Sequence, residues 1–215
     1  MDYVEHLLGH EEGPVVLMQA RSTRRAVAGF TIIELMVTVT LVAILVGLAV
    51  PAFNAWISNA QVRTVAEALQ NGIRTAQAEA VRRNRQVVLS FTNATPALNA
   101  AAVANGKNWS LQTVASLGDT AGDYLQGGAM ADVASTTTIT SGVSAICFNA
   151  NGRLVTNTSP GPAGASCTAS PTTFNVTQPN ADRNLNVLVQ IGGQLRMCDP
   201  KRTLSSTSPD GCPVP

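Results

Sequence analysis

The chain of 215 residues contains little charge and few aromatic side chains. Charged residues make up 13% of it and aromatic residues 4%, whereas average globular domains carry about 25% charged residues. Lys and Arg together number 14 and Asp and Glu 13, which gives a formal net charge of +1. This balance excludes a strongly basic nucleic-acid module and an acidic disordered tail. A core built from this chain must depend on Val, Leu, Ile and Ala.

Histidine is almost absent. His6 and His10 are the only two, so a chain that loses its N-terminal segment loses every histidine. That excludes Ser-His-Asp and Cys-His catalysis and His-ligated metals. The sequence also has no P-loop, G-x-S-x-G or H-E-x-x-H motif, and we interpret Asp119 and Asp123 as loop residues with only a weak calcium signal. We therefore expect that the protein is not an enzyme and that it has no cofactor and no metal site.

An apolar run is the most informative feature that is present. It extends from Phe30 to Val50, and Glu34 is its only charged residue. A helix of 21 residues spans about 31 Å, close to the hydrocarbon thickness of a bilayer. Arg21, Arg24 and Arg25 precede the run, and positive charge ahead of a single span predicts a cytoplasmic N-terminus. The C-terminal part is then expected on the other side of the inner membrane, in the periplasm.

A small-residue site precedes the apolar run, whereas an ordinary secretory signal is cut after its run. Cleavage between Gly29 and Phe30 would keep the apolar helix and create a new N-terminus at Phe30. The leader over residues 1–29 is long, and Met18 offers an alternative start whose shorter leader carries three Arg and no acid. The sequence leaves the choice between Met1 and Met18 open.

Gly29, Phe30, Glu34, the apolar run and Pro51 together resemble the N-terminal signal of type IV prepilins and pseudopilins. The resemblance implies that a prepilin peptidase cuts after Gly29 and that Phe30 is N-methylated. It also implies that Glu34 neutralises the N-terminal amine of a neighbouring pilin. A carboxylate at membrane depth needs such a partner, because it costs roughly 2.5–3.5 kcal/mol on insertion scales. Pro51 is expected to kink the helix at the membrane exit.

Helical periodicity continues beyond Pro51. Apolar residues recur in steps of three and four, at Val62, Val65, Leu69, Ile73, Ala76 and Ala80, which predicts a helical face packed on a domain. Arg82, Arg83 and Arg85 follow, where cations favour the C-terminal end of a helix dipole. We interpret them as solvated capping residues in preference to a phosphate site. One helix is thus predicted over residues 30–85.

The remaining residues, 86–215, are predicted to form an antiparallel β-domain, which gives an α+β fold of the type IV pilin kind. Asn149 to Gly152 and Gly192-Gly193 have the composition of hairpin turns. Residues 93–108 and 118–134 are predicted to be loops. The expected strands are Gln86–Thr92, Trp109–Val114, Thr136–Ser141, Ala145–Asn149, Arg153–Thr156, Thr172–Thr177, Asn186–Ile191 and Gln194–Cys198.

Three segments narrow the resemblance. Residues 78–89 are similar to the helix-to-strand junction of the GspH/FimT family, and residues 147–153 are similar to a strand-turn segment of the same family. Residues 193–200, together with Cys212, resemble the C-terminal tail of FimT and FimU proteins. This resemblance implies a minor pilin that enters a type IV pilus and helps build its tip complex with other pilins. A pseudopilin of type II secretion shares the leader and the helix. The Cys-x-Pro tail favours the pilus branch.

Some members of that family bind DNA through a Gly-Arg-x-Arg turn. At the matching positions Gln194 replaces the first Arg, and only Arg196 carries over. The nearby Arg183, Lys201 and Arg202 are candidates for a rebuilt phosphate-binding patch, which would be salt-sensitive. Acidic residues in the same region oppose it. DNA uptake is therefore an alternative function.

All four cysteines, Cys147, Cys167, Cys198 and Cys212, lie in the part expected outside the cytoplasm, where disulfides persist. Four cysteines allow three pairings. Pairing of nearest neighbours gives Cys147–Cys167 and Cys198–Cys212. Each bond would close a loop with little core of its own and contribute about 3 kcal/mol.

Overall fold

One long helix, α1 (Ile32–Arg83), opens the structure. The computed structural model describes residues 29–213, apart from the side chains at positions 51, 131 and 133. The leader residues 1–28, with the two candidate starts, and the Pro51 side chain, on which the expected kink depends, lie outside this description. Contacts divide the chain into two compact units, with the boundary between Ile44 and Leu45.

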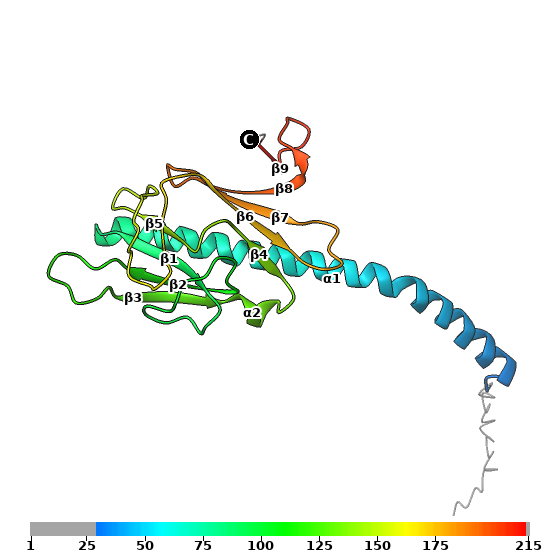
Figure 1. Cartoon of the computed structure of the whole chain (residues 1–215). Coiled ribbons are helices and arrows are strands. Elements are labelled where there is room, and N and C mark those ends of the chain that lie inside the picture. The colour runs from blue at the N-terminus through cyan, green and yellow to red at the C-terminus, as the bar shows by residue number, and fades with distance from the viewer. Residues whose placement is uncertain (1–28, 214–215) are drawn as a thin grey trace, which may run out of the picture. The chain divides into compact units, whose positions relative to one another are not determined.

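The first unit contributes the beginning of α1, where every described side chain is exposed. The second unit contains the remainder of α1 and all of the strands. Figure 1 shows the strands lying along this second part of the helix. The six apolar positions that the periodicity assigns to a packed face, from Val62 to Ala80, are at most 1% exposed.

Between residues 29 and 213, nine strands form two sheets. The four-stranded sheet has the order β3-β2-β1-β5 and the five-stranded sheet the order β4-β6-β7-β8-β9. All pairings are antiparallel except β8 with β9. The α+β fold class with a long helix on antiparallel sheets is thus confirmed. The strands are β1 (Val87–Thr92), β2 (Asn108–Thr113), β3 (Tyr124–Ala129), β4 (Thr138–Thr140), β5 (Ala145–Phe148), β6 (Thr172–Thr177), β7 (Leu185–Val189), β8 (Leu195–Thr203) and β9 (Gly211–Cys212); the short helix is α2 (Met130–Val133).

A single large core joins the helix to both sheets. Leu69 and Ile73 of α1, Phe91 of β1 and Phe174 of β6 all belong to it and are at most 1% exposed. The rings of Phe91 and Phe174 lie 5.2 Å apart, so the two sheets meet directly beside the helix. Burial of such side chains contributes about 1.5–3 kcal/mol each, which makes α1 the element that holds the two sheets together.

Two sequence expectations about the strands are wrong. Residues 118–134, expected as a loop, contain β3 and α2. Residues 153–156, expected as a strand, make only an isolated bridge from Leu154 to Phe148. The strand β3 was hidden because Gly127 and Gly128 break the alternation that identifies a strand. These glycines are required: a Cβ at Gly128 would lie 2.5 Å from the Trp109 indole nitrogen.

Candidate functional site

The apolar stretch of α1 is the first candidate site. Every described side chain from Phe30 to Val50 is exposed, and the most apolar window of the helix has a mean hydropathy of 2.5 with none of it buried. Thr38 and Thr40 donate their hydroxyl hydrogens to Leu35 O and Val37 O, each at 2.9 Å. Their polar groups are therefore satisfied within the helix, as an apolar environment requires. By length and composition this stretch fits a membrane span.

Glu34 lies in the first turn of this helix. Its backbone N–H donates to Thr31 Oγ1 at 3.2 Å, so Thr31 caps the helix start. An acid in a first turn is favoured by the helix dipole. Within residues 29–213, no hydrogen-bond or ion-pair partner of the Glu34 carboxylate is found. Gly29 and Phe30 precede the helix and are exposed, and a Cβ at Gly29 would meet nothing within 4 Å. The backbone at the expected cleavage position is therefore accessible.

Two disulfides join nearest neighbours in the sequence. Cys147 of β5 bonds Cys167, and Cys198 of β8 bonds Cys212 of β9. The second bond closes residues 198–212, called here the C-terminal segment. Its two halves lie against each other, because Asp199 N–H donates to Asp210 O and Leu204 N–H to Cys212 O.

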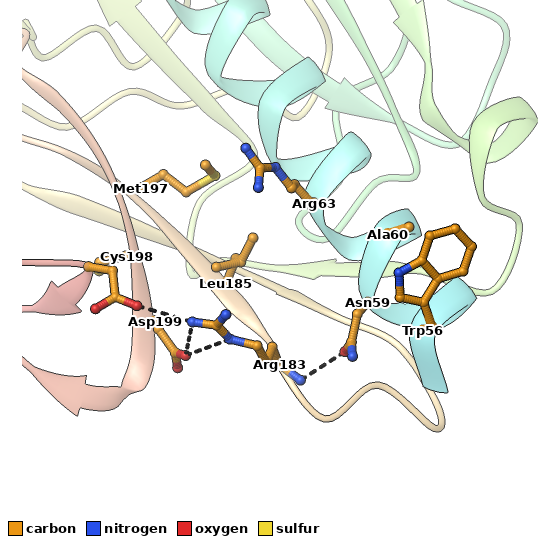
Figure 2. Close-up of a pocket in the computed structure, with 10 residues that line it drawn as sticks. Trp56, Asn59, Ala60, Arg63, Arg183, Leu185, Met197, Cys198 and Asp199 are labelled. Atoms are coloured by element: carbon orange, nitrogen blue, oxygen red, sulfur yellow. Dashed lines mark hydrogen bonds and ion pairs between the residues drawn. The ribbon is translucent and has the colours of Figure 1, made fainter. Parts of the chain in front are cut away.

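The four cations proposed for DNA are all brought to the C-terminal segment, where they contact acids and carbonyls. Arg183 donates to Asp199 at 3.3 Å and to Asp210 at 3.0 Å, and its backbone N–H donates to Asn59 Oδ1 on α1 (Figure 2). Arg202 donates to Asp210 at 3.1 Å. Asp199 is buried, with its side chain 4% exposed. These cations therefore tie the β6–β7 loop, the C-terminal segment and α1 to one another.

The other two cations bind main-chain oxygens. Lys201 Nζ donates to Asp182 O at 2.6 Å, and Arg196 Nη2 donates to Pro209 O at 2.8 Å. Partial desolvation raises the pKa of Asp210, but the hydrogen bond and charge of Arg202 and the charge of Arg183 outweigh it and hold that pKa below its usual value. Gln194 lies in the turn before β8 and not on the strand. The structure thus places these residues together as an internal network.

The arginines at the end of α1 form a second network. Arg82 and Arg83 donate to Glu79 at 2.6 and 2.8 Å. Hydrogen bonds from Arg82 and then Arg83 lower the pKa of Glu79 to about 2. Arg85 pairs with Asp119. Capping and ion pairing thus account for this cluster, and the Arg85 pair gives Asp119 a partner other than calcium.

A groove beside the C-terminal segment was not foreseen from the sequence. It runs between α1 and the strands β7 and β8, with a volume of about 510 Å³ (Figure 2). Trp56 and Arg63 of α1 line it together with Arg183, Asp199 and Asp210. One available signal was Trp56 itself, an exposed aromatic residue shortly after the apolar run. The pairing of Arg183 could not be predicted, because its partners Asp199 and Asp210 lie 16 and 27 residues away in the sequence.

Comparison with solved structures finds matches of low identity with TM-scores below 0.5. Type IV minor pilin FimU of Pseudomonas aeruginosa is 20% identical, covering 65% of this chain and 97% of that one, with a TM-score of 0.45. The minor pseudopilin EpsH of the Vibrio cholerae Type 2 Secretion System is 10% identical over 66% of this chain and 99% of that one, with the same TM-score. Escherichia coli GspH is 11% identical over 66% and 89%, with a TM-score of 0.42. No curated protein matches the chain.

Family models give the decisive comparison. The model described as the prokaryotic N-terminal methylation motif matches residues 24–50. These residues include Gly29, Phe30, Glu34 and the apolar stretch. The model described as Type II transport protein GspH matches residues 65–193, which is more than half of the chain. The chain therefore belongs to the GspH family and carries the prokaryotic N-terminal methylation motif ahead of the matched domain.

Proposed function

We propose that this chain is a minor pilin of a type IV pilus, which is held in the inner membrane by the apolar stretch of α1 and then enters the filament. The observation that carries the proposal is the exposed apolar surface from Phe30 to Val50 within a methylation motif. An apolar helix face of this size requires lipid or other apolar helices as its surroundings. A membrane supplies the lipid, and a filament core supplies the other apolar helices.

Processing is the first step of the proposed function. Cleavage between Gly29 and Phe30 and N-methylation of Phe30 by a prepilin peptidase would leave the apolar helix at the new N-terminus. The topology follows from the three arginines ahead of the run, which keep the leader cytoplasmic. The β-domain is then periplasmic, where its two disulfides persist.

A charge pair provides the selectivity of assembly in this proposal. The Glu34 carboxylate of one subunit would accept hydrogen bonds from the Phe30 amine of its neighbour. Charge-assisted hydrogen bonds are about twice as strong as neutral ones, and more so where water is excluded. Pro51, at the end of the apolar stretch, would adapt the helix to the filament where the membrane ends.

The choice of pilus over secretion filament depends on the tail. The motif Cys198-Asp199-Pro200 with a later Cys212 resembles the tails of pilus members, and these two cysteines are bonded. Deletion of the gene distinguishes the two functions: we expect fewer surface pili and unchanged secretion of the type II substrates. Unchanged pili with lost secretion would instead assign the chain to a type II secretion filament.

DNA uptake has weaker support as a function. Asp182, Asp199 and Asp210 lie among the four tail cations, and Arg183 and Arg202 already pair with carboxylates. A phosphate would have to displace these internal partners. A gel shift of duplex DNA at two salt concentrations tests the alternative. Salt-sensitive binding that Arg196→Ala weakens and Gln194→Arg strengthens would restore it.

A further inference from the structure

The groove between α1 and the strands β7 and β8 has an apolar floor and a charged rim. Leu185 and Met197 form the floor, and Figure 2 shows Arg63 extending from α1 toward Met197 while Trp56 lies at the other end of the opening. The Trp56 side chain is 66% exposed. A volume of about 510 Å³ falls within the range of roughly 300–1,000 Å³ that small-molecule sites occupy. The groove is therefore large enough for a small polar group attached to an apolar chain.

The charges on the rim have both signs in equal number. Arg63 and Arg183 are positive, and Asp199 and Asp210 are negative. Arg183 pairs with Asp199 at 3.3 Å and with Asp210 at 3.0 Å. Arg63 is 72% exposed and uses only Nε, toward Glu67; among the described residues its two Nη groups have no partner. Asp210 accepts hydrogen bonds from Arg183 and Arg202 and is still 43% exposed. One free guanidinium edge and one paired but partly exposed carboxylate therefore face the same groove.

The position of the groove in the chain places it beside the membrane exit. The apolar run from Phe30 to Val50 is long enough to cross the hydrocarbon, so the membrane ends near Pro51. Phe53 and Trp56 follow directly, with ring centroids 6.0 Å apart, and aromatic residues favour the membrane interface. The groove begins at Trp56 and so opens in the lipid headgroup layer.

We propose that this groove binds a zwitterionic phospholipid headgroup of the phosphoethanolamine class while the subunit waits in the membrane. The Arg63 Nη groups donate to the phosphate, because a guanidinium fork matches phosphate oxygens. The primary ammonium donates to the exposed side of the Asp210 carboxylate, which keeps its bonds to Arg183 and Arg202, and the acyl chains leave the groove past Phe53 and Trp56. The inference rests on the membrane anchoring in the proposed function. A headgroup with equal positive and negative charge complements a rim whose own charges cancel.

Native mass spectrometry of the full chain in detergent, titrated with three phospholipids, tests the inference. All three carry the phosphate. Phosphatidylethanolamine also has a primary ammonium, phosphatidylcholine has a quaternary ammonium without N–H donors, and phosphatidylglycerol has no ammonium group. We expect retention of phosphatidylethanolamine to exceed that of the other two by about fivefold or more. Arg63→Gln and Trp56→Ala should remove this preference. Arg74→Gln is the matched control, because Arg74 is an exposed arginine of the same helix that does not line the groove.

Equal retention of the three lipids by the unmodified chain, or an unchanged preference in Arg63→Gln, would overturn the inference. Filament incorporation of the same variants separates this result from the proposed function. Normal processing and incorporation with no lipid preference would leave the minor-pilin function intact and reject the lipid site. Poor incorporation with an unchanged lipid preference would identify the groove as a subunit contact instead. Both disulfides in the intact mass establish that each variant has folded.

Discussion

Glu34 differs from every neighbour in the apolar stretch of α1 because it alone carries a charge. Its backbone is fixed by the Thr31 cap, while no partner of its carboxylate is found among the described residues. A carboxylate without a partner within residues 29–213, yet costly to place in a membrane, is explained by a contact in the assembled state. Its removal should therefore affect assembly and leave the β-domain unchanged.

Replacement of Glu34 by Gln tests this role at the level of one charge. We expect the variant to insert, to be processed and to form both disulfides, but to enter sheared filaments about tenfold less than the unmodified chain. The expected loss corresponds to one charge-assisted hydrogen bond. Immunoblots of sheared filaments and of membranes measure the two fractions. Glu67→Gln is the control, since Glu67 pairs only with exposed Arg63; equal incorporation of both variants would reject the charge pair.

Glu79 gives a prediction about pH. Hydrogen bonds from Arg82 and Arg83 lower its pKa from 4.5 to about 2. A lowered pKa in the folded state means that the stabilisation is present above the unfolded pKa of 4.5 and is lost as pH falls through 2. After allowance for solvent screening, Glu79→Gln should reduce the free energy of unfolding by about 1 kcal/mol at pH 7. Thermal unfolding at pH 7 and pH 2 should show this difference at pH 7 and most of it lost at pH 2, where Glu79 is about half protonated in the folded state; equal differences would contradict the ion pair as its source.

The packing of α1 against the first sheet depends on two glycines, one on either side of Trp109. A Cβ at Gly72 would lie 2.8 Å from the Trp109 ring, and one at Gly128 would lie closer still. A glycine inside a helix costs about 1 kcal/mol relative to alanine. The close approach of helix and strand through the indole accounts for its presence at position 72.

Two glycine-to-alanine substitutions in α1 distinguish the effect of helix propensity on stability from the effect of packing. Gly72→Ala should lower the free energy of unfolding by about 1–3 kcal/mol, because the overpacked methyl outweighs the gain in helix propensity. Gly47→Ala is the matched case, since its Cβ would meet nothing within 4 Å. Thermal unfolding of the two variants gives the comparison. A stabilised Gly72→Ala chain would show that the indole is free to move aside.

An element of this fold could be predicted from the sequence where the residues that determine it are close together in the chain. The helical face from Val62 to Ala80 repeats at a fixed spacing, so the buried side of α1 was predictable. The disulfides follow sequence neighbours and were predictable too. The strand β3 was not predictable, because its Gly128 is required by the contact with Trp109, a residue of another strand. The cations of the tail could be identified from the sequence, but their ion pairs could not. Asp199 and Asp210 meet Arg183 only because β7 pairs with β8 and the C-terminal segment folds back.

At the scale of the whole molecule, α1 serves two environments with one continuous helix. Its first residues expose apolar side chains without burying any, whereas the second unit buries its own helical face under two sheets. The second unit thus has a complete core that needs no contribution from the apolar stretch. This separation is what a filament subunit requires, because the apolar stretch must leave lipid and enter a protein assembly while the β-domain stays folded.

The central claim is that the chain is a processed pilin whose apolar helix enters a filament. The most direct test is the intact mass of the chain isolated from sheared filaments without reduction. We predict a polypeptide that begins at N-methylated Phe30, retains the apolar stretch and carries both disulfides. A chain that still carries residues before Phe30, or that begins after Val50, would contradict the account.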